Sequence, residues 1–172
     1  MSAEKPSIIV SLMTSDKGDD TASAMNSEAP RPVLVVLDSN AVLDWLVFDD
    51  PSMQPIAAMI ASGQWRWMGT AATLQELATV LRRPGLDAWR NRLEPALVQA
   101  ARLCSLVPAP TTMAPAHLRC TDVDDQKFID LAVAQRAALL FTRDKALLRL
   151  ARRARDHGVV VLRPVDWVPT QA

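Results

Sequence analysis

VLVVLDSNAVLDWL, at residues 33–46, carries the strongest fold signal in this sequence. It begins with five apolar residues in a row (33–37), a pattern typical of a strand buried on both faces of a parallel sheet. The apolar run ends at Asp38, Ser39 and Asn40, after which an apolar helical pattern resumes. Asp38 therefore lies where a buried strand turns into a helix, where it can serve as a helix cap or hold a ligand.

The rest of the folded part alternates between short apolar runs and helical patterns. Further strands are predicted at 65–69, 105–108, 138–142 and 159–162, and helices at 40–47, 52–62, 73–83, 124–137 and 145–158. Residues 87–104 predict one or two more helices, with Pro95 as a break or a first turn. Strands separated by helices imply parallel crossovers. We therefore predict an α/β fold, a three-layer α/β/α sandwich with a parallel sheet of about five strands.

The composition is typical of a globular protein with one folded domain. The chain has 172 residues, of which 49% are hydrophobic and 22% charged, with 19 basic and 19 acidic residues. Residues 1–31 are polar and lack periodicity, so we predict a disordered leader, followed by a folded domain at 32–168 and a tail at 169–172. Met25 is an alternative start to Met1.

The sequence shows no membrane-targeting pattern and no cysteine or histidine pattern typical of a zinc site. No apolar run reaches the roughly 20 residues that span a membrane, and no signal peptide is evident, so we expect a cytoplasmic protein. Cys104 and Cys120 lack metal-ligand spacing, which indicates reduced structural thiols. His117 and His157 are far apart in the sequence, which argues against a histidine-rich metal site.

Acidic residues cluster at the ends of the predicted elements. Asp38 follows the first strand, Asp144 follows the penultimate strand, Asp125 with its neighbour Asp124 opens the helix before that strand, and Glu76 lies inside the middle helix. Ligands of open α/β sheets bind outside the carboxyl ends of the strands, so these carboxylates are candidates for one site. Taken singly, each aspartate also fits a cap or a turn, and the glutamate fits a solvated helix face.

Several carboxylates that converge on one point repel one another unless a cation neutralises them. Hard divalent metals prefer such oxygen ligands, and with few histidines and no thiol cluster, Mg²⁺ or Mn²⁺ is favoured over Zn²⁺. A metal of this kind polarises a phosphate oxygen and activates a water, which suits phosphodiester hydrolysis. No glycine-rich phosphate loop and no G-x-S-x-G motif compete with that interpretation.

Four motifs in order carry a family resemblance. They are LDSN (37–40), LQELATVLRRPGL (74–86), DVDDQKFIDLA (122–132) and LLFTRD (139–144). Together they resemble the PIN domain, the nuclease fold of VapC-like toxins in bacterial toxin–antitoxin operons, over about residues 33–165. The resemblance implies a Mg²⁺- or Mn²⁺-dependent endoribonuclease that cuts single-stranded RNA, as the toxin of a type II toxin–antitoxin pair.

The resemblance also assigns roles to individual residues. It implies that the catalytic metal site consists of Asp38, Glu76, Asp125 and Asp144. Asn40 and Thr142 match supporting positions of the family's motifs. Asp124 stays open as an alternative ligand to Asp125. The family further implies a cognate antitoxin and a homodimer as partners.

Basic residues near the predicted cleft are candidates for binding RNA phosphates. They are Arg82, Arg83, Lys127, Arg143 and Lys145. A second basic cluster on the late helix fits either a solvated face or an RNA track. Its members are Arg149, Arg152, Arg153 and Arg155.

Two other functions are compatible with parts of the pattern. One is a PIN fold that binds RNA or a protein without cutting, which the four intact acids disfavour. The other is a phosphatase with an aspartyl nucleophile at Asp38, in which a second aspartate would stand two residues later, where this chain has Asn40. A receiver domain also ends a strand in aspartate but fits Glu76 less well.

Overall fold

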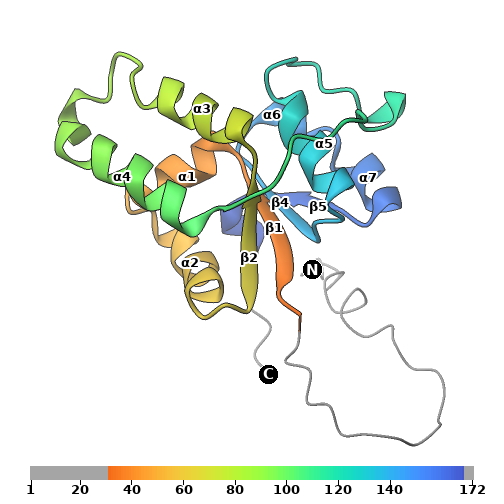
Figure 1. The fold of residues 1–172 in the computed structure, drawn as a ribbon, viewed down its shortest axis with the longest axis horizontal. Helices are drawn as coiled ribbons and strands as arrows, with labels where there is room; N and C mark the ends of the chain where they lie inside the picture. Colours follow the sequence, from red (N-terminus) through yellow and green to blue (C-terminus); the bar gives the residue numbers. More distant parts are fainter. Residues whose placement is uncertain (1–30, 169–172) are drawn as a thin grey trace, which may run out of the picture. The chain divides into compact units, whose positions relative to one another are not determined.

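Five parallel strands form one sheet in residues 31–168, the part of the chain that the computed structural model describes (Figure 1). They are β1 Val33–Leu37, β2 Trp65–Gly69, β3 Ser105–Leu106, β4 Leu139–Phe141 and β5 Val160–Leu162. The strand order is β3-β2-β1-β4-β5, so the predicted parallel sheet is confirmed, with β1 at its centre. The predicted leader, except for Arg31, and the tail lie outside the described residues.

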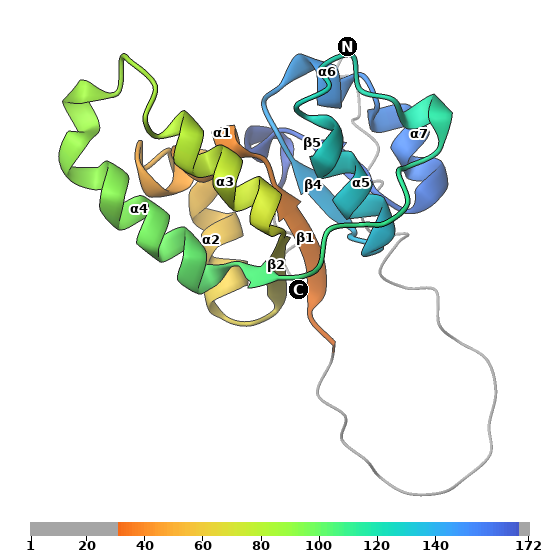
Figure 2. The same cartoon turned by 45° about the horizontal axis from the view of Figure 1, so that its top comes forward.

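Helices cover the two faces of this sheet in separate groups, as Figures 1 and 2 show. One face carries α1 Ser39–Leu46, α2 Gln54–Ala61, α3 Ala71–Val80 and α4 Arg90–Leu103. The other carries α5 Gln126–Ala134, α6 Lys145–Leu148 and α7 Ala151–Ala154. This division follows from the strand order, because right-handed crossovers that run in opposite directions from the centre place their helices on opposite faces. The predicted three-layer sandwich is therefore confirmed.

Short 3₁₀ helices complete the connections. They are η2 Pro51–Met53, η3 Asp87–Trp89, η4 Ala116–Leu118, η5 Arg155–His157 and η6 Pro164–Asp166. Of all the helices in residues 31–168, none has the length and apolar character needed to cross a membrane.

The core lies on both sides of the sheet because successive strand residues point to opposite faces. Val36 and Leu140 belong to a buried cluster that includes Phe128 of α5. Aromatic rings form a second packed group, in which the Trp65 ring lies 5.9 Å from Phe141 and 4.7 Å from Trp167 between centroids. A strand with both faces covered reads as a continuous apolar run, which explains the VLVVL pattern.

Pro95 does not interrupt its helix as the sequence suggested. A single helix, α4, runs through this residue from Arg90 to Leu103. Proline removes one backbone hydrogen bond from a helix interior. Here α4 packs against α1 and α3 and buries Ala96 and Ala100, so tertiary packing outweighs the local break.

The predicted helix 145–158 is instead divided into α6, α7 and η5. The division comes at Leu150, whose N–H donates to the carbonyl of Leu147 at 2.9 Å, a tighter turn than the α-helical one. Leu147, Leu150 and Ala154 are all buried, so the segment keeps one apolar side against the core. Gly158, with φ of 76°, ends the last turn in the left-handed conformation.

Gly69, the last residue of β2, is required by close packing. A Cβ atom added there would lie 2.3 Å from the Sγ of Cys104. We expect Gly69→Ala to lower the free energy of unfolding by about 1–3 kcal/mol, as overpacking does in a filled core, measured by urea denaturation. In a Cys104→Ala background the same substitution should cost less, because the sulfur is gone. An equal cost in both backgrounds would show that the contact with Cys104 is not the cause.

Candidate active site

The direction in which the chain adds strands to the sheet reverses between β1, the central strand, and its neighbour β4. From β1 the chain goes on to β2 on one side, and from β4 to β5 on the other. Such a switch point leaves a crevice at the carboxyl ends of the strands, where ligands bind in open α/β folds. Asp38 follows β1 directly, and its N–H donates to the carbonyl of Phe141 at 3.0 Å. Asp144 lies three residues after β4, at the same edge.

Asp38 is both a helix cap and a buried member of the site. Its Oδ1 accepts a hydrogen bond from the N–H of Ala41 at 2.7 Å, which caps α1. Its Oδ2 accepts from the hydroxyl of Thr142, which is itself fully buried. Burial, as the main cause, raises the pKa of Asp38 from 3.8 to about 6. The cap and the site are therefore compatible interpretations of the same residue.

Thr142 connects the turns that follow the two central strands. Its Oγ1 donates to Asp38 and accepts from the N–H of Asp144 at 2.9 Å. One hydroxyl thus sets the spacing between the two acids, which gives this predicted supporting residue a definite structural role. Asn40, the other predicted supporting residue, is exposed. Its neighbour Ser39 is buried.

Glu76 reaches the site from α3 and is held from two sides. The hydroxyl of Ser39 donates to its Oε1 at 2.9 Å, and the ammonium of Lys127 forms an ion pair with its Oε2. These contacts link α1, α3 and α5 above the carboxyl end of the sheet. Sequence analysis did not assign Ser39 a role in the site; a small polar residue directly after the cap, at a buried helix position, was the available signal.

Asp125 faces the other acids from the start of α5. Burial is the main cause that raises its pKa from 3.8 to about 7, and neighbouring carboxylates add to it. In decreasing order these belong to Asp144, Asp122, Glu76 and Asp38. Asp124 is exposed, and its N–H is occupied by the side chain of Asp122 at 2.9 Å. Of the two adjacent candidates, Asp125 is the one whose charge is coupled to the other predicted ligands.

The loop before Asp125 is fixed by two polar residues of α5 that sequence analysis missed. Gln126, a buried residue, accepts from the N–H of Cys120 at 2.7 Å, and its amide donates to Asp130 at 2.8 Å. Asp130 also accepts from the N–H of Ala114 at 2.8 Å. The connection from β3 is thereby held against α5, which positions the acidic turn. The available sequence signal was their spacing of four residues, which places Gln126 and Asp130 on one face of the helix.

A further missed residue, Asp44 of α1, holds the turn after β4. One guanidinium nitrogen of Arg143 lies 2.7 and 2.8 Å from its two carboxylate oxygens. Asp44 is 3% exposed, and burial raises its pKa although the hydrogen bond from Arg143 opposes that shift. Arg143 was predicted to bind RNA. In the structure its guanidinium fastens the Thr142–Asp144 turn to α1.

The other predicted RNA-binding residues are distributed around the site. Lys127 pairs with Glu76, whereas Lys145 is exposed beside Asp144. Arg82 and Arg83 are exposed at the end of α3. The four predicted acids thus lie at one edge of the sheet. Of the predicted RNA-binding residues, Lys127 and Arg143 form ion pairs with acidic residues, and the other three are exposed.

The two histidines, which are far apart in the sequence, are in contact in the folded protein. His117 and His157 stack with ring centroids 5.1 Å apart, and their Nε2 atoms lie 2.9 Å from each other. They connect η4 to the end of η5. Cys104 and Cys120 are both buried and free, and burial raises the pKa of each thiol.

The donor atoms at the sheet edge suit a hard divalent cation in type and charge. All are carboxylate oxygens, and their mutual repulsion contributes to the raised pKa of Asp125. In the described residues, however, no three acidic, histidine or cysteine side chains are grouped closely enough to hold a metal ion. Asp38 is bonded to Thr142, Glu76 to Lys127, and Asp144 to the N–H groups of α6. A carboxylate that accepts a hydrogen bond keeps lone pairs for a cation, so of these contacts only the ion pair of Glu76 with Lys127 competes directly with metal binding.

Comparisons with known proteins agree with this architecture. A family model described as a PIN domain matches residues 34–146, more than half of the chain. The crystal structure of VapBC2 from Rickettsia felis bound to a DNA fragment from their promoter matches with a TM-score of 0.50 and 13% identity, over 76% of this chain and 98% of that one. FitAB bound to an IR36 DNA fragment matches with a TM-score of 0.45 and 16% identity, over 80% and 99%. No curated protein matches significantly. Likeness at such identities concerns the fold alone.

Proposed function

This chain belongs to the PIN domain family, and we propose that it is a divalent-metal-dependent endoribonuclease that hydrolyses phosphodiester bonds of single-stranded RNA. The observation that carries the proposal is the geometry at the switch point of the sheet, where Thr142 joins Asp38 to Asp144 and Ser39 joins the same turn to Glu76. Asp125 lies close enough for neighbouring carboxylates to raise its pKa. Carboxylates held against their mutual repulsion at such an edge are a feature of sites that bind cations.

The residues that would hold Mg²⁺ or Mn²⁺ are Asp38, Glu76, Asp125 and Asp144. When bound, a divalent metal polarises a phosphate oxygen and lowers the pKa of its bound water. Through its two hydrogen bonds, Thr142 fixes the position of Asp38 relative to the turn that carries Asp144. The hydroxyl of Ser39 orients Glu76. The ammonium of Lys127 lies on the Glu76 carboxylate. If Glu76 served as a metal ligand, the ammonium of Lys127 would be available to contact a substrate phosphate.

We further propose that the protein acts in the cytoplasm as the toxin of a toxin–antitoxin pair, as a homodimer restrained by a cognate antitoxin. The four motifs shared with VapC-like toxins support this, and two free thiols suit a reducing compartment. Co-expression with the product of the adjacent gene tests the pairing. Formation of a stable complex with loss of nuclease activity is expected, and full activity in the presence of that product would contradict the pairing.

Cleavage itself is tested with labelled single-stranded RNA in Mg²⁺ or Mn²⁺. The wild type should cut, and EDTA should abolish cutting. Asp125→Asn should reduce the rate more than about a hundredfold, beyond the usual effect of a residue that only supports a metal ligand. Asp124→Asn should lose less, because the side chain of Asp124 is exposed. Asp156→Asn, an exposed change on η5, serves as the control.

Two outcomes would refute this assignment. Cleavage that persists in EDTA, or equal cleavage by Asp125→Asn and the wild type, would show that the acidic site does not carry the reaction. RNA binding without cutting would favour a non-cleaving PIN module. The internal hydrogen bonds of Asp38 and Asp144 are the feature compatible with that second function.

A further inference from the structure

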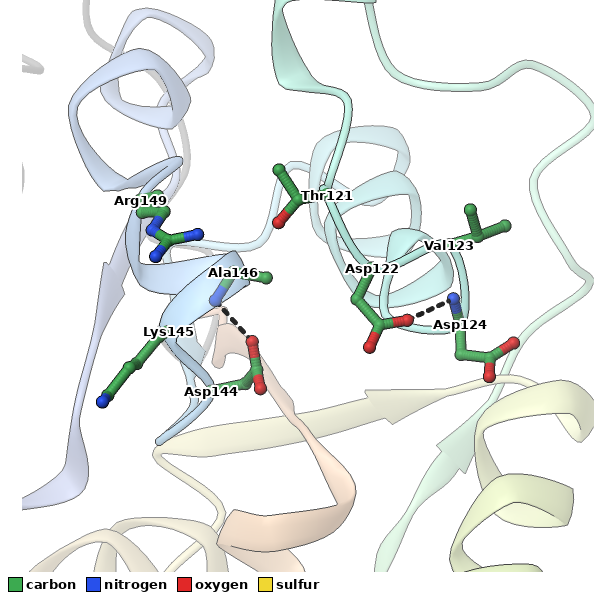
Figure 3. Close-up of a pocket in the computed structure, with 8 residues that line it drawn as sticks. All are labelled: Thr121, Asp122, Val123, Asp124, Asp144, Lys145, Ala146 and Arg149. Carbon is green, nitrogen blue, oxygen red and sulfur yellow. Dashed lines mark hydrogen bonds between the residues drawn. The ribbon is translucent and has the colours of Figure 1, made fainter.

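A cavity of about 590 Å³ adjoins the acidic site on the side of α6. It lies between the start of α6, which contributes Asp144, and the turn that contains Thr121, Asp122 and Asp124 (Figure 3). It is wide open to solvent, and its volume is large enough to accept a nucleotide. Because Asp144 belongs to both, a strand that crosses the acidic site would enter this cavity next.

The walls of the cavity differ in charge. Asp122 and Asp124 line one side, and Lys145 and Arg149 belong to the other. In Figure 3 the guanidinium of Arg149 points toward Thr121, whereas the side chain of Lys145 extends away from that turn. The cation that faces the cavity is therefore Arg149.

Arg149 and Lys145 take part in no ion pair within the described residues, whereas two other cations near the site do. Lys127 is paired with Glu76 and Arg143 with Asp44. Within residues 31–168, Arg149 is exposed and has no salt bridge or side-chain hydrogen bond to another described residue. A planar guanidinium of this kind matches phosphate geometry and forms paired hydrogen bonds with it.

We propose that this cavity binds the nucleotide next to the cleaved bond, and that Arg149 holds its phosphate. The inference rests on the proposed function and deepens it. It divides the late basic cluster, because Arg149 lies at the site, whereas Arg153 donates to the carbonyl of His117 and so serves the fold. The hydroxyl of Thr121, on the facing wall, supplies a second donor for the same phosphate.

Binding is measured by fluorescence anisotropy with a short labelled single-stranded RNA in EDTA, so that no strand is cut. Loss of one phosphate contact predicts that Arg149→Ala binds about fourfold more weakly at 0.15 M salt, with a salt slope about 0.7 smaller. Arg149→Lys should keep the slope because it keeps the charge. The matched control is Arg152→Ala, three positions further along, which is exposed and does not line the cavity. It should bind like the wild type.

Equal affinities of Arg149→Ala and Arg152→Ala, or no measurable binding by the wild type, would overturn the inference. With Mg²⁺ or Mn²⁺ present, Arg149→Ala should raise KM and leave kcat unchanged, as expected for a residue that binds substrate without taking part in the reaction. The two proposals fail separately. Absence of cleavage by the wild type refutes the nuclease assignment, whereas the anisotropy result tests Arg149 whether or not RNA is cut.

Discussion

Asp38→Asn is expected to abolish RNA cleavage and at the same time to stabilise the metal-free protein. Its activity should fall by more than about a hundredfold, because asparagine lacks the charge that a metal ligand supplies. Its free energy of unfolding at pH 7.5 should rise by about 3 kcal/mol, the equivalent of a pKa raised from 3.8 to about 6. Asparagine keeps the cap of α1, so the helix start is preserved.

The pH dependence gives this prediction its sign. A carboxyl group whose pKa is raised in the folded state binds its proton more tightly there than in the unfolded state. The contribution of Asp38 to the free energy of unfolding is therefore most favourable at low pH, and it falls as the pH rises from about 4 to 6. The asparagine variant lacks that loss. Urea denaturation in EDTA should therefore show a difference that is large at pH 7.5 and below about 1 kcal/mol at pH 4.

Asp156→Asn is the control for these denaturation experiments, because this residue is exposed and takes part in none of the hydrogen bonds described for the site. It should leave both activity and the pH profile unchanged. If Asp38→Asn were less stable than the wild type at both pH values, the buried carboxylate would be a stabilising cap rather than a group held at a cost for function.

Arg143→Ala is expected to destabilise the protein by about 2 kcal/mol at pH 7.5. Removing one partner of a buried ion pair costs about 3–5 kcal/mol, and the smaller value allows for the half-exposed guanidinium. The substitution leaves Asp44, which is 3% exposed, without its counter-charge. Cleavage should also decrease, because the turn that carries Thr142 and Asp144 loses its connection to α1.

A double-mutant cycle separates this role from RNA binding. Adding Asp44→Asn to Arg143→Ala should recover most of the lost stability, since no buried charge then remains. The control is Arg82→Ala at the exposed end of α3, which should change stability by less than about 0.5 kcal/mol. Unchanged stability of Arg143→Ala together with weaker RNA binding would assign Arg143 to the substrate instead.

The class of fold and the edge of the sheet that carries the candidate site follow from local sequence patterns. A five-residue apolar run that ends in Asp38 is a local pattern, and burial on both faces of a strand is enough to produce it. The same holds for the order of strands and helices. Once the sheet is parallel, residues that follow its strands must lie at one edge, so Asp38 and Asp144 could be placed together without coordinates.

Which side chains meet at that edge depends on long-range packing. Thr142 bonds Asp38 across 104 positions, and Arg143 bonds Asp44 across 99. These pairings depend on the register of β1 with β4 and on how α1 packs over the sheet, which no local pattern encodes. Tertiary packing also allows α4 to continue as one helix past Pro95. Contacts between distant segments determine the partner of each side chain. They therefore also determine which basic residue stabilises the site and which one is available to bind the substrate.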